Sequence, residues 1–164
     1  MSEGKLKPKF VCDRMLGKLT TWLRISGYDT LYIGDLNVEN EDTYMVKNHW
    51  DRILLTKDRE LYRRAKAAGR DALLIKSDSV AEQMKEVMTL GVKFEPVMDR
   101  CSVCNTPLRK PSEEEAREVI EREKLGDDIL EKYELWYCER CRKLYWMGSH
   151  WRNMLRFLER LKFE

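Results

Sequence analysis

Four aspartates follow short apolar runs that are typical of buried strands. They are Asp13, Asp35, Asp58 and Asp78. Because the carboxyl ends of parallel strands meet at one edge of a sheet, we expect the four carboxylates to share that edge. Gathered carboxylates repel one another unless cations lie between them. Since carboxylate oxygens suit Mg²⁺ or Mn²⁺, the pattern predicts a metal site that activates water to hydrolyse a phosphodiester.

Each aspartate also has an alternative interpretation as a helix cap. Aspartate is a favoured N-cap, and loops between a strand and a helix often contain one. Asp78 is the exception, because Ser79 and Glu82 already form a predicted capping box for the next helix. The two histidines, His49 and His150, lie far apart in the sequence, so they give little support to a two-histidine ribonuclease.

Four of the five cysteines form two pairs, Cys101-x-x-Cys104 and Cys138-x-x-Cys141. Paired motifs of this kind supply four thiolates that can enclose one Zn²⁺ tetrahedrally and leave no open position for catalysis. We therefore expect a structural zinc ion, with unliganded thiols or disulfides as the alternative. Cys12 is left over and is expected to be a small buried residue within a strand.

The segments that must position the aspartates alternate between strand and helix patterns. Strands are predicted over 9–13, 29–35, 52–56 and 72–78. Helices are predicted over 14–28, 41–50, 59–69 and 80–91. This alternation predicts a Rossmann-like α/β sandwich with a mainly parallel sheet.

The chain is expected to divide near residues 97–100 into two domains, 1–98 and 99–164. The second would contain the cysteine pairs, an acidic helical insertion at about 112–134, and a C-terminal helix. Ser112 and Glu115 are spaced as a capping box at the start of the insertion. The insertion is not expected to touch RNA.

Composition narrows the class of protein. The 31 Lys and Arg nearly balance 29 Asp and Glu, so any surface that binds nucleic acid must be local. Apolar runs stay well below the roughly 20 residues that span a bilayer, and the start lacks the apolar core of a signal peptide. We expect a cytoplasmic protein with no membrane partner. The high charged fraction and only four prolines resemble a thermostable protein.

Several stretches resemble one known family. The strand end "FVCD" looks like the first acidic strand end of a PIN-like nuclease, and "LLTKD" looks like its Thr-x-Asp strand end. Together with "CDRMLGKLTTWLRISGYDT" and "YWMGSHW", nearly the whole chain resembles the family named for the C-terminal ribonuclease domain of Mut-seven, a PIN-like domain fused to a zinc ribbon. The resemblance implies a metal-dependent ribonuclease, expected to be an endonuclease that leaves a 5′-phosphate and a 3′-hydroxyl.

The resemblance also implies roles for single residues. Asp13 and Asp58 match the most recognisable acidic positions, and Asp78 matches a later, more variable one. Another acid is expected at the start of the helix before the Thr-x-Asp strand, where Glu41 and Asp42 both fit and Asp42 is preferred.

The expected catalytic residues are therefore Asp13, Asp42, Asp58 and Asp78. Those expected to bind Mg²⁺ or Mn²⁺ are Asp13, Asp58, Asp35 and Glu41. Thr56 is expected either to orient Asp58 or a bound water, or to be an ordinary β-branched strand residue.

Basic residues near these acids are expected to hold RNA phosphates. A helix after Asp58 would place Arg59, Arg63 and Arg70 on one face, although a solvated helix surface is the alternative. The RNA-binding residues expected from the whole chain are Arg14, Lys18, Arg59, Arg63, Arg64, Arg142, Lys143, Arg152 and Arg156.

The C-terminal segment offers a second basic surface. In the terminal helix one face is apolar, and the arginines Arg152, Arg156 and Arg160 form another. Tyr145 and Trp146 are expected either to stack on unpaired bases or to fill the small core of a zinc ribbon. The apolar face, expected to dock on other parts of the chain, consists of Trp151, Met154, Leu155, Leu158 and Leu161.

The expected partner is RNA with unpaired regions, and a homodimer is possible. One alternative is a noncatalytic RNA-binding or ribosome-associated adaptor, which would bind RNA without Mg²⁺ and leave it intact. A second alternative is a phosphoryl-transfer enzyme with Asp13 as the nucleophile. It ranks lower because Met15 stands where such enzymes often keep a second aspartate.

Overall fold

The computed structural model describes residues 6–162. These residues form two compact units. One contains 6–24 and 28–94, and the other contains 25–27 and 95–162. Within 6–162, no helix has the length and apolar character needed to cross a membrane.

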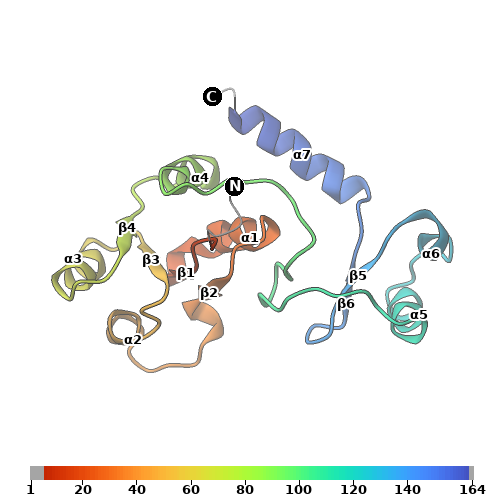
Figure 1. The fold of residues 1–164 in the computed structure, drawn as a ribbon, viewed down its shortest axis with the longest axis horizontal. Helices are drawn as coiled ribbons and strands as arrows, with labels where there is room; N and C mark the ends of the chain where they lie inside the picture. Colours follow the sequence, from red (N-terminus) through yellow and green to blue (C-terminus); the bar gives the residue numbers. More distant parts are fainter. Residues whose placement is uncertain (1–5, 163–164) are drawn as a thin grey trace. The chain divides into compact units, whose positions relative to one another are not determined.

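The first unit is a parallel sheet with helices on both faces (Figure 1). Its strands are β1 (Phe10–Cys12), β2 (Thr30–Tyr32), β3 (Ile53–Thr56) and β4 (Ala72–Leu74). Its helices are η1 (Arg14–Leu16), α1 (Gly17–Ile25), η2 (Ile33–Asp35), α2 (Glu41–Lys47), α3 (Arg59–Ala67) and α4 (Val80–Met88). The strand order is β2-β1-β3-β4, with every neighbouring pair parallel. This confirms the predicted α/β class.

Side chains of the central strands alternate between the two faces of the sheet. Val11 of β1 and Leu54 of β3 are buried in one apolar cluster with Met45 of α2 and residues of α3. Cys12 forms a side-chain hydrogen bond with Thr20 of α1, and burial raises the pKa of its thiol to about 12. Cys12 is therefore a small buried residue, as predicted.

Strands β2 and β4 are shorter than predicted. The chain leaves β2 by turning into η2, which a 3.0 Å backbone hydrogen bond from Leu36 N–H to Ile33 O closes. It leaves β4 where the Glu86 carboxylate accepts hydrogen bonds from backbone N–H groups just beyond the strand. The predicted ends of both strands were therefore wrong, and neither Asp35 nor Asp78 comes directly after a strand.

Helix α2 also ends before its predicted limit, and Arg70 helps to hold the turn that follows it. His49 has a positive φ of 59°, which a continuing helix does not allow. Arg70, expected to face RNA, lies beyond α3 and is only 2% exposed. Its guanidinium donates hydrogen bonds to the backbone carbonyls of Met45, Asn48, His49 and Arg52. The expectation for Arg70 was therefore wrong.

The second unit joins an antiparallel hairpin to helices. Its elements are α5 (Glu113–Arg122), α6 (Ile129–Lys132), β5 (Trp136–Cys138), β6 (Lys143–Tyr145) and α7 (Ser149–Lys162). The predicted capping box begins α5: the Glu115 carboxylate accepts from Ser112 N–H at 2.9 Å, and the Ser112 hydroxyl accepts from Glu115 N–H at 3.1 Å. One apolar cluster connects the hairpin to the insertion, and it includes Ala116, Val119, Ile120, Ile129, Leu135, Tyr137 and Leu144.

The two ends of the insertion lie next to each other. Lys110, just before it, forms an ion pair with Glu134 at 2.8 Å. Arg109 and Tyr137 are joined by an antiparallel backbone bridge. The insertion therefore begins and ends at adjacent positions beside the hairpin, and its helices supply much of the hairpin's apolar core.

We predict that Arg70→Lys destabilises the protein by about 1–3 kcal/mol, because an ammonium cannot satisfy the carbonyls that the planar guanidinium reaches. Urea unfolding followed by circular dichroism would measure the change. Arg63→Lys, on the exposed surface of α3, is the matched control and should change stability by less than about 0.5 kcal/mol. Equal effects of the two substitutions would contradict a structural role for Arg70.

Candidate functional site

Asp13 and Asp58 follow the two central strands, β1 and β3, which are neighbours in the sheet. Backbone pairing continues past the end of β1, since Asp13 N–H donates to Leu55 O at 3.0 Å. Asp13 is buried and Asp58 is exposed. The parallel topology therefore brings these two aspartates to the carboxyl edge of adjacent strands, where open α/β sheets bind ligands.

The hydroxyl of Thr56 connects the two aspartates. It donates a 2.7 Å hydrogen bond to Oδ2 of Asp13 and accepts a 2.9 Å hydrogen bond from the backbone N–H of Asp58. Thr56 is fully buried, so water does not compete for its hydroxyl. Thr56 thus orients Asp13 directly and the start of the Asp58 loop through its backbone.

Asp13 and Asp58 are also helix N-caps, so a capping role and a role in a metal site are compatible for both residues. Oδ1 of Asp13 accepts from Arg14 N–H at 2.8 Å. Oδ1 of Asp58 accepts from the N–H groups of Glu60 and Leu61 at 2.8 and 3.2 Å. Capping fixes each carboxylate in place while leaving further lone pairs for another ligand.

Asp42, in the first turn of α2, completes a group of three carboxylates. Burial, followed by the charges of Asp13 and Asp58, raises the pKa of Asp42, and Arg64 offsets part of the rise. The helix start that presents Asp42 is capped by Asn40, whose side chain accepts from Thr43 N–H at 3.2 Å. A divalent cation among these hard oxygen donors would relieve the repulsion that raises the pKa of Asp42.

Glu41, the neighbour of Asp42, is already paired. Arg14 Nε donates to its carboxylate at 3.2 Å, and Arg14 Nη2 makes a second, short contact with it. Hydrogen bonding to Arg14 lowers the pKa of Glu41. The structure therefore favours Asp42 over Glu41 as the acid from α2 that interacts electrostatically with Asp13 and Asp58.

Asp35 and Asp78 lie beyond the two outer strands, on opposite sides of the central pair. Asp35 accepts from the buried Arg24 guanidinium at 3.3 Å. Asp78 pairs with Lys57, and its side chain is 96% exposed. The charges that act on the pKa of Asp42 are chiefly those of Asp13, Asp58 and Arg64. We therefore leave both out of the candidate site.

The basic residues of the first unit differ in how available they are. Arg63 pairs with Glu60 on the surface of α3. Arg64 donates to Thr43 Oγ1 at 3.0 Å, close to the start of α2. Lys18 and Arg59 are exposed, with no ion-pair partner among residues 6–162. Lys18 and Arg59 are thus the cations best placed to meet a phosphate without breaking an existing pair.

The two cysteine pairs converge as the sequence predicts. Cys101 and Cys141 Sγ lie 3.8 Å apart, and Cys104 and Cys138 Sγ lie 3.5 Å apart. A tetrahedral zinc site with Zn–S bonds of about 2.3 Å has sulfur separations of about 3.8 Å. Within the described residues, these thiols are the one group of three or more His, Cys, Asp or Glu ligand atoms that all lie within 4.8 Å of one another.

Matching turns present the two pairs. The N–H of Asn105 donates to Cys101 O at 2.9 Å, and the N–H of Arg142 donates to Cys138 O at 2.7 Å. Asn105 and Arg142 both have positive φ, at 73° and 55°. The four thiols can therefore hold one zinc ion, while the carboxylates of the first unit are spread more widely.

Several residues expected to bind RNA in the second unit have structural contacts. Arg142 pairs with Glu118 of α5. Lys143 lies over the ring of Tyr145 at 5.2 Å. The Tyr145 hydroxyl lies 3.1 Å from Cys101 Sγ.

The side chains of helix α7 and of the residues before it differ in their exposure. Trp146 packs against the apolar cluster, which fits the core interpretation. Arg152 and Arg156 are exposed, and Arg156 donates to Asn153 at 3.3 Å. Leu155 is 45% exposed, so the expected apolar face of this helix was wrong at that position.

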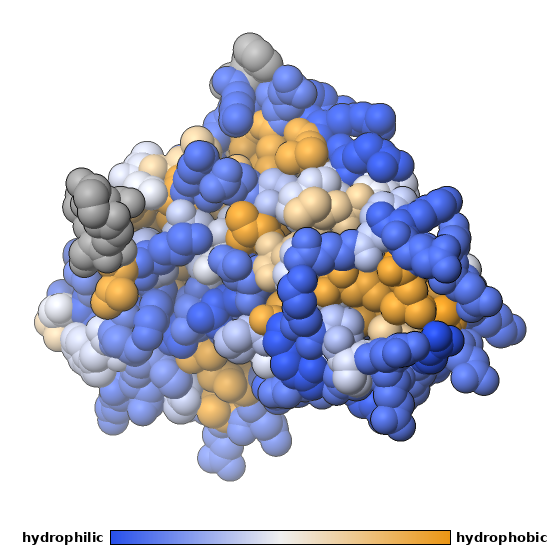
Figure 2. Space-filling view, turned by 45° about the vertical axis from the view of Figure 1, so that its right-hand side comes forward, coloured by the Kyte–Doolittle hydropathy of each residue, from blue (hydrophilic) through white to orange (hydrophobic). Residues whose placement is uncertain are grey.

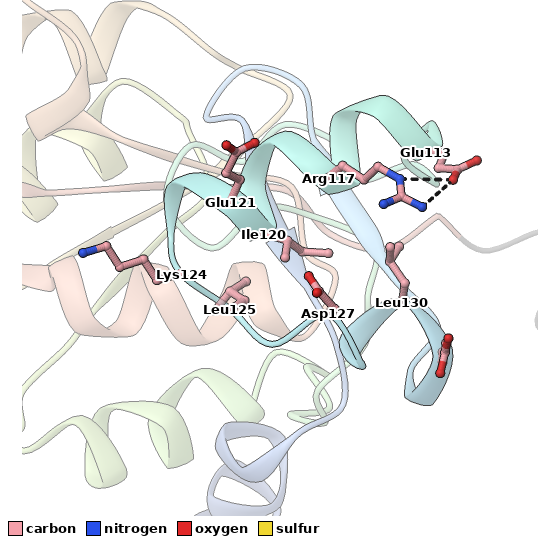
Figure 3. Close-up of a pocket in the computed structure, with 9 residues that line it drawn as sticks. Glu113, Arg117, Ile120, Glu121, Lys124, Leu125, Asp127 and Leu130 are labelled. Atoms are coloured by element: carbon pink, nitrogen blue, oxygen red, sulfur yellow. Dashed lines mark hydrogen bonds and ion pairs between the residues drawn. The ribbon is translucent and has the colours of Figure 1, made fainter.

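A groove of about 800 Å³ lies between α5 and α6 (Figure 3). Ile120, Leu125 and Leu130 line it together with Glu121 and other acidic residues. Its rim is mixed in charge, because Arg117 and Lys124 lie among the acidic residues. All residues that line the groove belong to the second unit.

Tyr32 is a residue of this region that the sequence reasoning missed. Its hydroxyl donates a 2.6 Å hydrogen bond to the backbone carbonyl of Arg14. A Cβ at Gly34 would lie 2.4 Å from Cε2 of Tyr32, so the ring packs directly on the glycine. The sequence signal was the pairing of an aromatic residue with a nearby glycine in "YIGD", which no local pattern links to Arg14.

Comparison with known proteins gives one match. A family model described as "Mut7-C RNAse domain" matches residues 8–158. No curated protein and no solved structure matched the chain.

We predict that Asp42→Asn stabilises the protein at neutral pH. Because folding raises the pKa of Asp42, the native state binds more protons between the unfolded and folded pKa values, so stability falls as pH rises through that window. Removing the charge should raise Tm by about 1–3 °C at pH 7, and the gain should vanish below about pH 4.

Calorimetry across this pH range would measure the effect. Glu39→Gln, which removes an exposed charge two residues before α2, is the control and should leave Tm nearly unchanged. A lower Tm of Asp42→Asn at pH 7 would contradict repulsion among the three carboxylates.

Proposed function

Because the chain belongs to the Mut7-C RNAse domain family, we propose that it is a metal-dependent endoribonuclease whose site lies at the carboxyl edge of the parallel sheet. The residues that we assign to the site are Asp13, Asp42 and Asp58. The observation that carries the assignment is the buried Thr56 hydroxyl, which ties the ends of both central strands together. RNA is the substrate that the family description implies.

The three carboxylates fit a hard divalent cation, Mg²⁺ or Mn²⁺. They offer oxygen donors, and the repulsion that raises the pKa of Asp42 is what a cation would remove. When bound, such an ion would supply a water of lowered pKa and positive charge for the phosphate oxygens. The chain would position this ion through Asp13 and Asp58. Their carboxylates are held in place by the Thr56 hydroxyl and by the N–H groups that they cap.

RNA would be held by cations around these acids. Lys18 and Arg59 are free to bind phosphates, and Arg64 lies beside the start of α2. Arg14 could reach a phosphate only by leaving Glu41. In the second unit, the exposed Arg152 and Arg156 of α7 are the remaining candidates.

The proposed division of labour follows the two expected domains. Residues 1–98 would carry out hydrolysis. Residues 99–164 would form a zinc ribbon that is structural, because four thiolates fill the coordination sphere and leave no position for a substrate. The acidic insertion would stay away from RNA and support the hairpin through the shared apolar core.

We predict that Asp58→Asn lowers the rate of RNA cleavage by at least about 100-fold, since it removes one metal-binding charge while asparagine still caps α3. The assay follows an end-labelled single-stranded RNA with Mg²⁺, Mn²⁺ or EDTA. Asp78→Asn, an exposed carboxylate outside the assigned site, is the matched control and should cut at the wild-type rate.

Cleavage that needs a divalent ion and disappears in Asp58→Asn would support the nuclease. Intact RNA under every metal, with binding retained, would instead favour a noncatalytic RNA-binding adaptor. Equal losses in Asp58→Asn and Asp78→Asn would argue against this choice of carboxylates.

We further predict that the purified protein carries about one zinc ion per chain, and that Cys104→Ser lowers both zinc content and Tm. Elemental analysis and thermal unfolding would measure this. Cys12→Ala is the control, because Cys12 is buried in the sheet far along the chain from the four thiols, and it should keep its zinc. A reduced protein that binds no zinc on titration would refute the ribbon assignment.

A further inference from the structure

Met15 is a large apolar side chain that is exposed and lies close in sequence to Asp13 of the proposed site. It lies two residues after Asp13 in η1, and 68% of its surface is accessible. Exposed apolar residues are scattered over the molecule, and Figure 2 shows them in separate patches between hydrophilic ones. A single one needs no explanation by itself. Met15 differs because it closely follows Asp13 and because hydrogen bonds anchor the turn that carries it.

The turn that carries Met15 is anchored on both sides. Before it, the Asp13 carboxylate accepts from Arg14 N–H at 2.8 Å. After it, Leu16 is fully buried, and its N–H donates to Asp13 O at 3.0 Å. The position of the Met15 backbone is therefore fixed relative to the Asp13 carboxylate.

A third anchor comes from Tyr32. Its hydroxyl bonds the carbonyl of Arg14, the residue just before Met15, at 2.6 Å. Tyr32 is in turn held by its close packing on Gly34. Because the backbone is already fixed, binding a ligand through Met15 would order only its side chain.

The neighbours of Met15 indicate what that ligand is. Lys18 is an exposed cation on the same segment, Arg14 is exposed but paired with Glu41, and Asp13 belongs to the proposed hydrolytic site. A polyanion bound there would leave its bases next to the phosphates that these charges hold. A thioether cannot bind phosphate, but its polarizable surface makes favourable contacts with aromatic rings.

We propose that Met15 contacts the face of an unpaired nucleobase next to the bond that is cut, which makes the enzyme selective for RNA with an unstacked nucleotide at that position. The inference rests on the proposed nuclease function and adds the substrate class to it. A base inside a duplex is covered on both faces by its neighbours, so it cannot offer a face to Met15.

The test combines a protein variant with a substrate variant. The cleavage position is first mapped on an end-labelled single-stranded RNA with the wild type and the divalent ion that supports cutting. RNAs with one abasic residue at each position that flanks the cut are then compared. Met15→Ala should lower kcat/KM on the normal RNA by roughly 2- to 10-fold, the range for losing one contact between a thioether and an aromatic ring.

The decisive result is the combination. On the RNA that lacks the contacted base, wild type and Met15→Ala should cut at the same rate, because the contact is already lost. Met15→Leu should retain most of the activity. Met88→Ala removes an exposed methionine at the end of α4 and should change neither substrate's rate, which controls for general effects of losing a methionine.

The failures are distinguishable. If the wild type cuts no RNA with any metal, the proposed function fails before Met15 is tested. If the wild type cuts but Met15→Ala is unaffected, or loses the same factor on every abasic RNA, the inference about Met15 is overturned while the nuclease stands. Equal kcat/KM on fully paired and unpaired RNA would also overturn it.

Discussion

The buried hydroxyl of Thr56 is the interaction on which the candidate site depends. It gives its hydrogen to Asp13 at the end of β1 and receives one from the backbone of Asp58 after β3, so a single oxygen sets the spacing of two strands at their functional edge. The Thr56 side chain is fully buried, and leaving its hydroxyl unpaired there would cost about 1–3 kcal/mol. The fold itself therefore positions Asp13 and Asp58 before any ligand binds.

The sequence predicted those parts of the site that local pattern controls. Asp13 and Asp58 were found because each lies within two residues of a strand end and directly before a helix, and parallel pairing then brings the strand ends together. Asp35 and Asp78 were predicted from the same pattern, and they lie beyond the outer strands, where Arg24 and Lys57 pair with them. In both places a local contact ended the strand early: a 3-10 turn after β2, and the Glu86 carboxylate beyond β4.

Residues with distant partners were harder to predict. Arg70 looked like one more cation of a basic helix, yet its guanidinium fills a turn about twenty residues earlier in the chain. The signal at Tyr32 was only the nearby glycine, which does not point to Arg14, because Arg14 precedes Tyr32 by 18 residues. The cysteines were the opposite case. Thiols that share one ion must converge whatever lies between them, so their spacing predicted a cluster that propensity alone would not have found.

The closed insertion of the second unit has a consequence for how this chain can vary. Its two ends are joined by the Lys110–Glu134 ion pair and the Arg109–Tyr137 bridge. The distance between the two cysteine pairs therefore does not depend on the number of residues, here 33, between Cys104 and Cys138. Helix α5 cannot be trimmed, since it supplies the hairpin's core. The link between α5 and α6, residues 123–128, is almost entirely exposed. At this link the chain can lengthen in evolution, or accept a genetically encoded tag, with least disturbance to the hairpin and the four clustered thiols.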